Sequence, residues 1–113
     1  MLFRSDEDWF KLAVADTGFG GNPLISADVT DTVLEVSIFH VCTSQPDYSY
    51  CEGTGTQEDG TIGGKGKGCF NLGSVKLNTD CKGLDESGTT FIRVRKRGDD
   101  GSCHAYNLTV KVE

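Results

Sequence analysis

The chain has 113 residues, a formal net charge of −6 and a hydrophobic content of 36%. This length allows one domain with a single modest core. Nucleic-acid binding needs a basic surface that neutralises phosphates, so the acidic balance excludes nucleic acid as a general partner. The longest apolar stretch, 33–41, is far shorter than the roughly 20 residues of a membrane span, so we expect no membrane insertion.

Short alternating segments follow a polar lead-in at 1–8. Strands are predicted over Trp9–Val14, Leu24–Val29 and Val33–Cys42, because apolar residues two apart leave the same face of a strand. The residues expected to face the core are Phe10, Leu12, Val14, Leu34, Val36 and Ile38. No segment has the apolar period of a helix.

The second half begins with a long polar, glycine-rich connection over 43–68. A strand is predicted over Cys69–Leu77, with Val75 and Leu77 inward. The last quarter, Gly88–Val112, alternates on both sides of a Gly-Asp-Asp-Gly turn and predicts a C-terminal hairpin. The expected fold is a single all-β domain over 1–113: an antiparallel, jelly-roll-like β-sandwich with disulfide-stapled loops.

Five cysteines lie in or beside polar connections, and none forms a C-x-x-C pair. This arrangement favours disulfides in a protein of an oxidising compartment, so the expected localisation is secreted, cell surface or periplasmic. The first four residues do not form a signal peptide, so export implies a removed signal or a longer parent chain. Proximity pairs Cys42 with Cys51 and Cys69 with Cys81 and leaves Cys103 over, although sequence leaves the other pairings open.

Motifs at both ends of the chain resemble a known family. They are an Asp-x-Asp-aromatic-aromatic segment, a Gly-x-x-Phe-x-x-Val strand and a closing Tyr-x-Leu-x-Val strand, formed by Asp6, Asp8, Trp9, Phe10, Gly88, Phe91, Val94, Tyr106, Leu108 and Val110. In this order they resemble the bacterial pre-peptidase C-terminal domain family. That resemblance implies a jelly-roll module appended to exported bacterial proteins, some of which bind calcium near the Asp-x-Asp pair.

Calcium is the one cofactor that the sequence suggests. It needs six to eight oxygen ligands from several segments. The carboxylates predicted to supply them are Asp6, Asp8, Asp28 and Asp31, with Asp99 and Asp100 as a weaker pair. The alternative is that acidic residues at strand ends supply turn chemistry and are solvated.

Two sets of residues are candidates for ligand binding. Tyr48 and Tyr50 lie between two cysteines, where exposed aromatic rings could contact a sugar. The basic side chains Arg93, Arg95 and Arg97 could dock an acidic partner, or could form a solvated outer face. Trp9 could join a stacking platform or lie in the core.

Enzyme chemistry finds little support. Cys103 and His104 are adjacent, so in a strand they would point to opposite faces, and His40 is expected to be structural. The run 63–68 lacks the register of a phosphate-binding loop. The sequence therefore predicts a non-catalytic, exported accessory module that binds polysaccharide or extracellular protein. The alternative is a structural subunit that associates with itself or with neighbouring domains, and an enzyme is a distant third.

Overall fold

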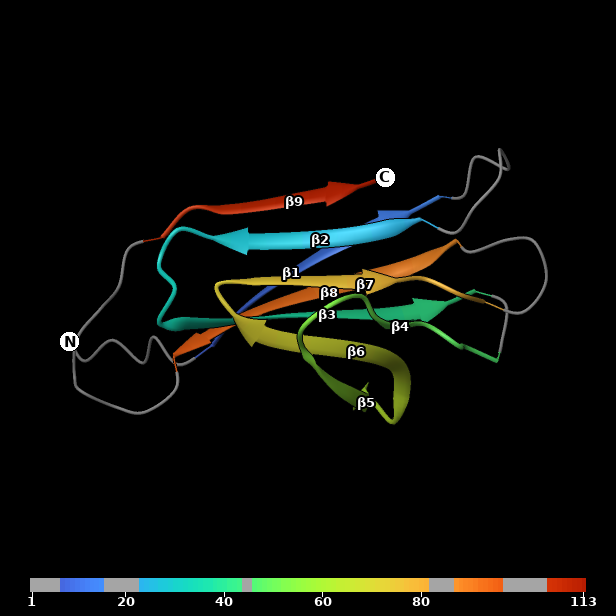
Figure 1. Cartoon of the computed structure of the whole chain (residues 1–113). Helices are drawn as coiled ribbons and strands as arrows, with labels where there is room; N and C mark the ends of the chain where they lie inside the picture. Colours follow the sequence, from blue (N-terminus) through green and yellow to red (C-terminus); the bar gives the residue numbers. More distant parts are fainter. Residues whose placement is uncertain (1–6, 16–22, 44–45, 82–86, 97–105) are drawn as a thin grey trace.

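In the computed structural model, two antiparallel sheets pack face to face (Figure 1). The structure describes residues 7–15, 23–43, 46–81, 87–96 and 106–113. One sheet has five strands in the order β1 (Glu7–Val14), β8 (Gly88–Lys96), β3 (Leu34–Cys42), β6 (Lys65–Leu72) and β5 (Thr56–Ile62). The other has four, in the order β4 (Tyr50–Cys51), β7 (Ser74–Asn78), β2 (Leu24–Val29) and β9 (Leu108–Val112).

The strand order is that of a jelly roll. The runs β1-β8-β3-β6 in one sheet and β2-β7-β4 in the other arise when a long hairpin wraps across two layers. Two strands depart from the simple pattern: β5 extends the first sheet beyond β6, and β9 extends the second beyond β2. The predicted antiparallel β-sandwich is therefore confirmed.

The core lies between the sheets and is built mainly on β3. Leu34, Val36 and Ile38 are buried there as predicted, and Val75 and Leu77 of β7 face them from the other sheet. Each such side chain stabilises the fold by about 1.5–3 kcal/mol relative to exposure. On the edge strand β1, the prediction that alternate residues face the core is only partly correct, because Val14 is buried whereas Phe10 is 42% exposed.

The predicted C-terminal hairpin is wrong. Strand β8 pairs with β1 and β3 in the first sheet, so both of its edges are already occupied. Strand β9 instead pairs with β2, with Val112 opposite Ile25, in the second sheet. Alternation identifies which face of a strand is buried, but it does not identify the neighbouring strand.

The predicted connection over 43–68 is also wrong. It contains β4, β5 and the start of β6, and β5 and β6 form a hairpin. Gly63 and Gly64 make the turn with φ angles of 59° and 83°, a region that favours glycine. These strands were missed because most of their residues are polar or glycine.

Two disulfides join the sheets, but not in the predicted pairs. Cys42 at the end of β3 bonds to Cys81 beyond β7, and Cys51 of β4 bonds to Cys69 of β6. The fold brings these pairs to Cα–Cα distances of 5.8 and 5.4 Å although they are 39 and 18 residues apart, so the shortest loop did not decide the pairing. Cys103 lies outside the described residues.

His40 is a buried core residue, as the sequence suggested. Its side chain projects from β3 and its Nδ1 lies 2.8 Å from the hydroxyl of Thr90 on β8. The described residues contain no helix long and apolar enough to span a membrane.

Candidate functional site

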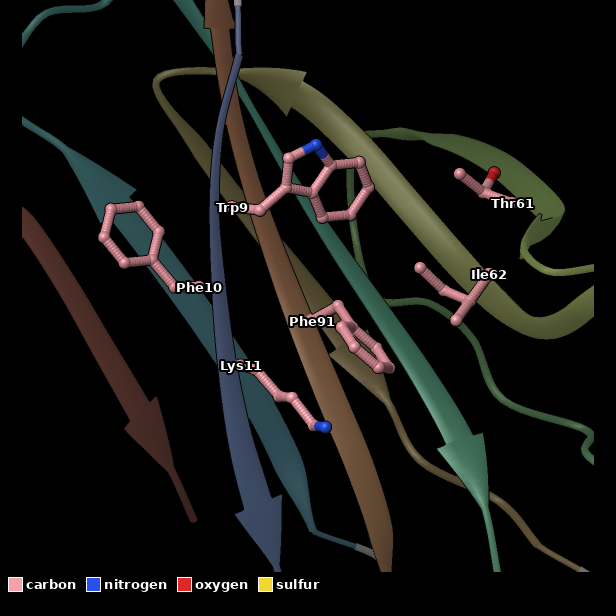
Figure 2. Close-up of a pocket in the computed structure, with 6 residues that line it drawn as sticks. All are labelled: Trp9, Phe10, Lys11, Thr61, Ile62 and Phe91. Atoms are coloured by element: carbon pink, nitrogen blue, oxygen red, sulfur yellow. The ribbon is translucent and has the colours of Figure 1, made fainter.

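An open groove of about 420 Å³ lies on the outer face of the five-stranded sheet (Figure 2). It is lined by Trp9, Phe10, Lys11, Thr61, Ile62 and Phe91. Strands β1 and β5 are the two edges of this sheet, so the sheet must curve for residues of both strands to line one groove. Figure 2 shows Trp9 and Phe91 on the side of β1 that faces Ile62, whereas the ring of Phe10 points the other way.

Beneath the Trp9 ring of the groove lies Phe39, a β3 side chain that is only 1% exposed. Gly68 lies opposite Phe39 on β6, and the missing side chain of this glycine leaves room for the ring. The Trp9 ring stacks on Phe39 with centroids 5.8 Å apart and planes 28° apart. The guanidinium of Arg93 lies 5.0 Å from the centroid of Phe39 and 5.7 Å from that of Trp9. These contacts fix the indole from below, since a cation over an aromatic face is attracted to it.

A buried ion pair closes the groove beneath its aromatic lining. Arg93 Nη2 lies 3.1 Å from Glu58 Oε1, across β3 and β6, and it donates to Ser37 Oγ at 2.9 Å. The same nitrogen lies 3.5 Å from Glu35 Oε1, and the Arg93 side chain is 4% exposed. Glu58 thereby links the β5 edge to β8 across the outer face of the sheet.

The predicted docking role of the basic strand is wrong for Arg93, because its guanidinium is buried and paired. Arg95 is also engaged: its Nε donates to Glu35 Oε1 at 2.7 Å, and its Nη1 lies 4.0 Å from Glu7. These carboxylates offset the positive charge that the sequence displays. Arg97 lies outside the described residues.

The ion pair between Glu58 and Arg93, called the latch below, depends on pH through the ionisation of Glu58. Burial raises the pKa of Glu58, but hydrogen bonds from Thr61 and Arg93 and the positive charge of Arg93 outweigh burial, so the pKa lies below 4.5. A carboxylate with a depressed pKa contributes stability above its unfolded pKa and loses it as the pH falls through the folded value.

We therefore expect acid to weaken the latch. Between about pH 5 and about pH 3, the wild-type chain should lose more free energy of unfolding than Glu58→Gln, which has no proton to gain there. Urea unfolding across this range measures the difference. Asp59→Asn is the matched control, because Asp59 lies next in the strand in an exposed pair with Lys67. Parallel pH profiles for the wild type and Glu58→Gln would contradict the latch.

The other predicted aromatic residues lie away from the groove. Tyr48 and Tyr50 are 58% and 47% exposed beside and on β4 of the four-stranded sheet, and neither lines the groove. Trp9 is 43% exposed, so it combines a buried contact to Phe39 with an accessible edge. The three rings do not form one platform.

The predicted calcium ligands are not brought together. Asp8 accepts a hydrogen bond from the hydroxyl of Tyr106 at 2.7 Å, Asp28 accepts one from Ser74, and Asp31 accepts one from the amide of Val33. Within the described ranges, the one group of three potential metal ligands is His40, Cys42 and Cys81, of which the cysteines form a disulfide. The shared site is therefore wrong for the three described aspartates, and Asp6 lies outside the described residues.

Sequence reasoning missed Lys11, Ile62 and Phe91 as groove residues. Alternation along β1 places Lys11 on the same face as Trp9, and the strand register sets Lys11 opposite Phe91. The alternation along β1 is a local signal, whereas the pairing with Phe91 joins distant parts of the chain. The contribution of Ile62 depends on the curvature of the whole sheet, for which the sequence has no signature.

The fold and the groove define a class, a disulfide-linked β-sandwich with an aromatic groove on one sheet. No family model, curated protein or solved structure matches the chain.

Proposed function

We propose that this protein is a non-catalytic, exported module that binds polysaccharide in the groove of the five-stranded sheet. The observation that carries the proposal is Trp9, a 43% exposed indole at the side of an apolar groove. The two disulfides are consistent with an oxidising compartment, which supports export. The resemblance to the pre-peptidase C-terminal domain family points to the same accessory role.

The indole is held in place before any ligand arrives. Its Nε1 donates to Glu7 at 3.0 Å, and its ring rests on Phe39. A sugar ring presents a face of C–H groups that packs against an aromatic surface, and the hydroxyl groups at its rim stay in water. A fixed aromatic side chain binds such a face at little entropic cost, because its rotamer is already restricted.

The groove has the dimensions and lining of a binding site. Its volume lies within the range of small-molecule sites, and apolar side chains dominate its walls. The hydroxyl of Thr61 donates to Glu58, and that carboxylate pairs with Arg93, so these groups serve the architecture of the groove. Such a lining suits recognition better than acid–base or nucleophilic chemistry.

Fluorescence tests the proposal directly, because Trp9 is the single tryptophan of the chain. Titration with soluble polysaccharides should shift or quench its emission in a saturable way. Trp9→Ala should weaken binding by at least about tenfold in affinity electrophoresis or calorimetry, since it removes the stacking surface. A thermal melt checks that the variant remains folded.

Tyr48→Ala and Tyr50→Ala are the matched controls, because they remove exposed rings from the other sheet. They should leave affinity unchanged. If the tyrosine variants lose binding and Trp9→Ala keeps it, the ligand site lies at β4 and the groove proposal fails.

Self-association is the second candidate. Phe10 and Val112 are 42% and 44% exposed on the edge strands β1 and β9, and their register partners Ile92 and Ile25 are fully buried. These two side chains thus leave apolar surface at the margins of the sandwich, where another copy could pack. Sedimentation that shows a dimer broken by Phe10→Ser would favour this function.

A further inference from the structure

The charges around the groove are unequally compensated. Arg93 and Arg95 face carboxylates at 2.7–3.5 Å, so their charge is largely neutralised within the protein. Lys11 is different: in the described parts of the chain, no carboxylate lies within 4.0 Å of its ammonium group. Its Nζ lies 5.9 Å from the centroid of the Phe91 ring.

We infer that the groove selects sugars that carry an anionic group, a uronate carboxylate or a sulfate, and that Lys11 binds this group while the sugar ring packs on Trp9. This inference rests on the proposed function and specifies its substrate class. The chemistry shared by the two kinds of ligand is a negative charge attached to a pyranose ring.

The spacing on β1 fits such a ligand. Trp9 and Lys11 are two residues apart on one face, which separates their Cα atoms by about 6.6 Å along the strand. An anionic group on a ring stacked against the indole would lie at the edge of that ring, within reach of the flexible lysine. Figure 2 shows both side chains, with Phe91, on the side of β1 that faces Ile62.

Lys11 is exposed, and its ammonium group lies 5.9 Å from the centroid of the Phe91 ring, so a ligand in the groove can reach the charge. The net charge of −6 works in the opposite direction at long range, because the molecule as a whole repels polyanions. Preference for an acidic sugar must therefore come from local contact with Lys11.

The test compares ligands that differ only in charge. Oligogalacturonate, its methyl ester and a sulfated galactan oligomer of equal length are titrated into the wild type, Lys11→Met, Lys11→Arg, Lys76→Met and Trp9→Ala, with calorimetry as readout. Lys11→Met keeps most of the aliphatic stem and removes the charge. Lys76→Met is the matched control, because Lys76 is an exposed lysine on β7 of the other sheet.

We expect the wild type to bind at least one anionic oligomer about fivefold more tightly than the methyl ester, the size of a good exposed ion pair. Lys11→Met should abolish this preference, whereas Lys11→Arg and Lys76→Met should keep it. Whether the galacturonate or the sulfated oligomer binds more tightly identifies the source of the charge. The preference should shrink in about 0.5 M salt.

The outcomes separate this inference from the proposed function. Equal, Trp9-dependent binding of charged and esterified oligomers would overturn the inference and leave polysaccharide binding intact. No binding of any oligomer would overturn both. Binding of polyglutamate as tight as that of oligogalacturonate and unaffected by Trp9→Ala would show charge attraction alone, and this too would overturn the inference.

Discussion

Replacing both cysteines of the Cys42–Cys81 bridge by serine should lower the free energy of unfolding by about 4 kcal/mol, and replacing both of Cys51–Cys69 by about 3 kcal/mol. The sequence separations are 39 and 18 residues, and a longer closed loop restricts the unfolded chain more. Both bridges also join the two sheets, so their loss frees one layer from the other. Urea unfolding without reductant measures both values.

A Cys103→Ser background prevents exchange with the fifth cysteine and serves as the reference for both stability differences. Peptide mapping under non-reducing conditions provides the structural check. A linked pair containing Cys42 and Cys51 would contradict the structure, as would a smaller stability loss from removing the longer loop than from removing the shorter one.

Gly68→Ala should destabilise the protein by about 3 kcal/mol, near the upper end for overpacked sites. A Cβ atom at this position would lie 2.2 Å from Cδ1 of Phe39 and 2.8 Å from the carbonyl oxygen of Glu58. The Phe39 ring cannot move aside easily, because Trp9 and Arg93 contact it. The melting temperature should fall by about 10 °C, and the proposed binding in the groove should weaken because the ring on which Trp9 stacks is displaced.

A double-mutant cycle identifies the cause of this loss. Phe39→Leu removes much of the ring that the new methyl group meets. The combined variant should therefore be less destabilised than the sum of the two single changes. Strict additivity would show that the clash with Phe39 is not the reason for the effect.

Period-two alternation predicted most of the core correctly. Local alternation shows which face of a strand is buried. It correctly assigned Leu34, Val36 and Ile38 to the core, together with Val75 and Leu77. Alternation does not show which strands are neighbours in a sheet. The alternating strands β8 and β9 are consecutive in the chain, yet each found its neighbours elsewhere, since a jelly roll places successive strands in different layers.

The β5–β6 hairpin escaped prediction for a related reason. Its inward residue Cys69 follows the run Lys-Gly-Lys-Gly, which has no apolar alternation, and the large side chain that covers Gly68 comes from β3. The apolar signal for this part of the sheet therefore lies about 30 residues earlier in the sequence, at Phe39. A short sequence window does not contain both Phe39 and the hairpin, so it cannot show that the ring covers Gly68.

The groove was predictable only in part. Trp9 was recognised as either a core residue or a stacking residue, and it is partly buried and partly exposed. The assignment of Arg93 to a docking surface failed because its neutralising partner, Glu58, lies 35 residues away on the far edge of the sheet. Charge compensation across a curved sheet depends on tertiary structure, which composition does not record.

Strand β1 has a single hydrogen-bonded neighbour and provides Trp9 and Lys11, whereas the buried side chains that define the fold belong mainly to β2, β3, β7 and β8. The residues that we propose to contact a ligand and those that maintain the architecture are therefore largely separate in the chain. Substitutions at Lys11, an exposed position of this edge strand, would change the charge of the groove without touching the buried core. A duplicated copy of this domain could thus acquire a new ligand by a short mutational route, with the sandwich inherited unchanged.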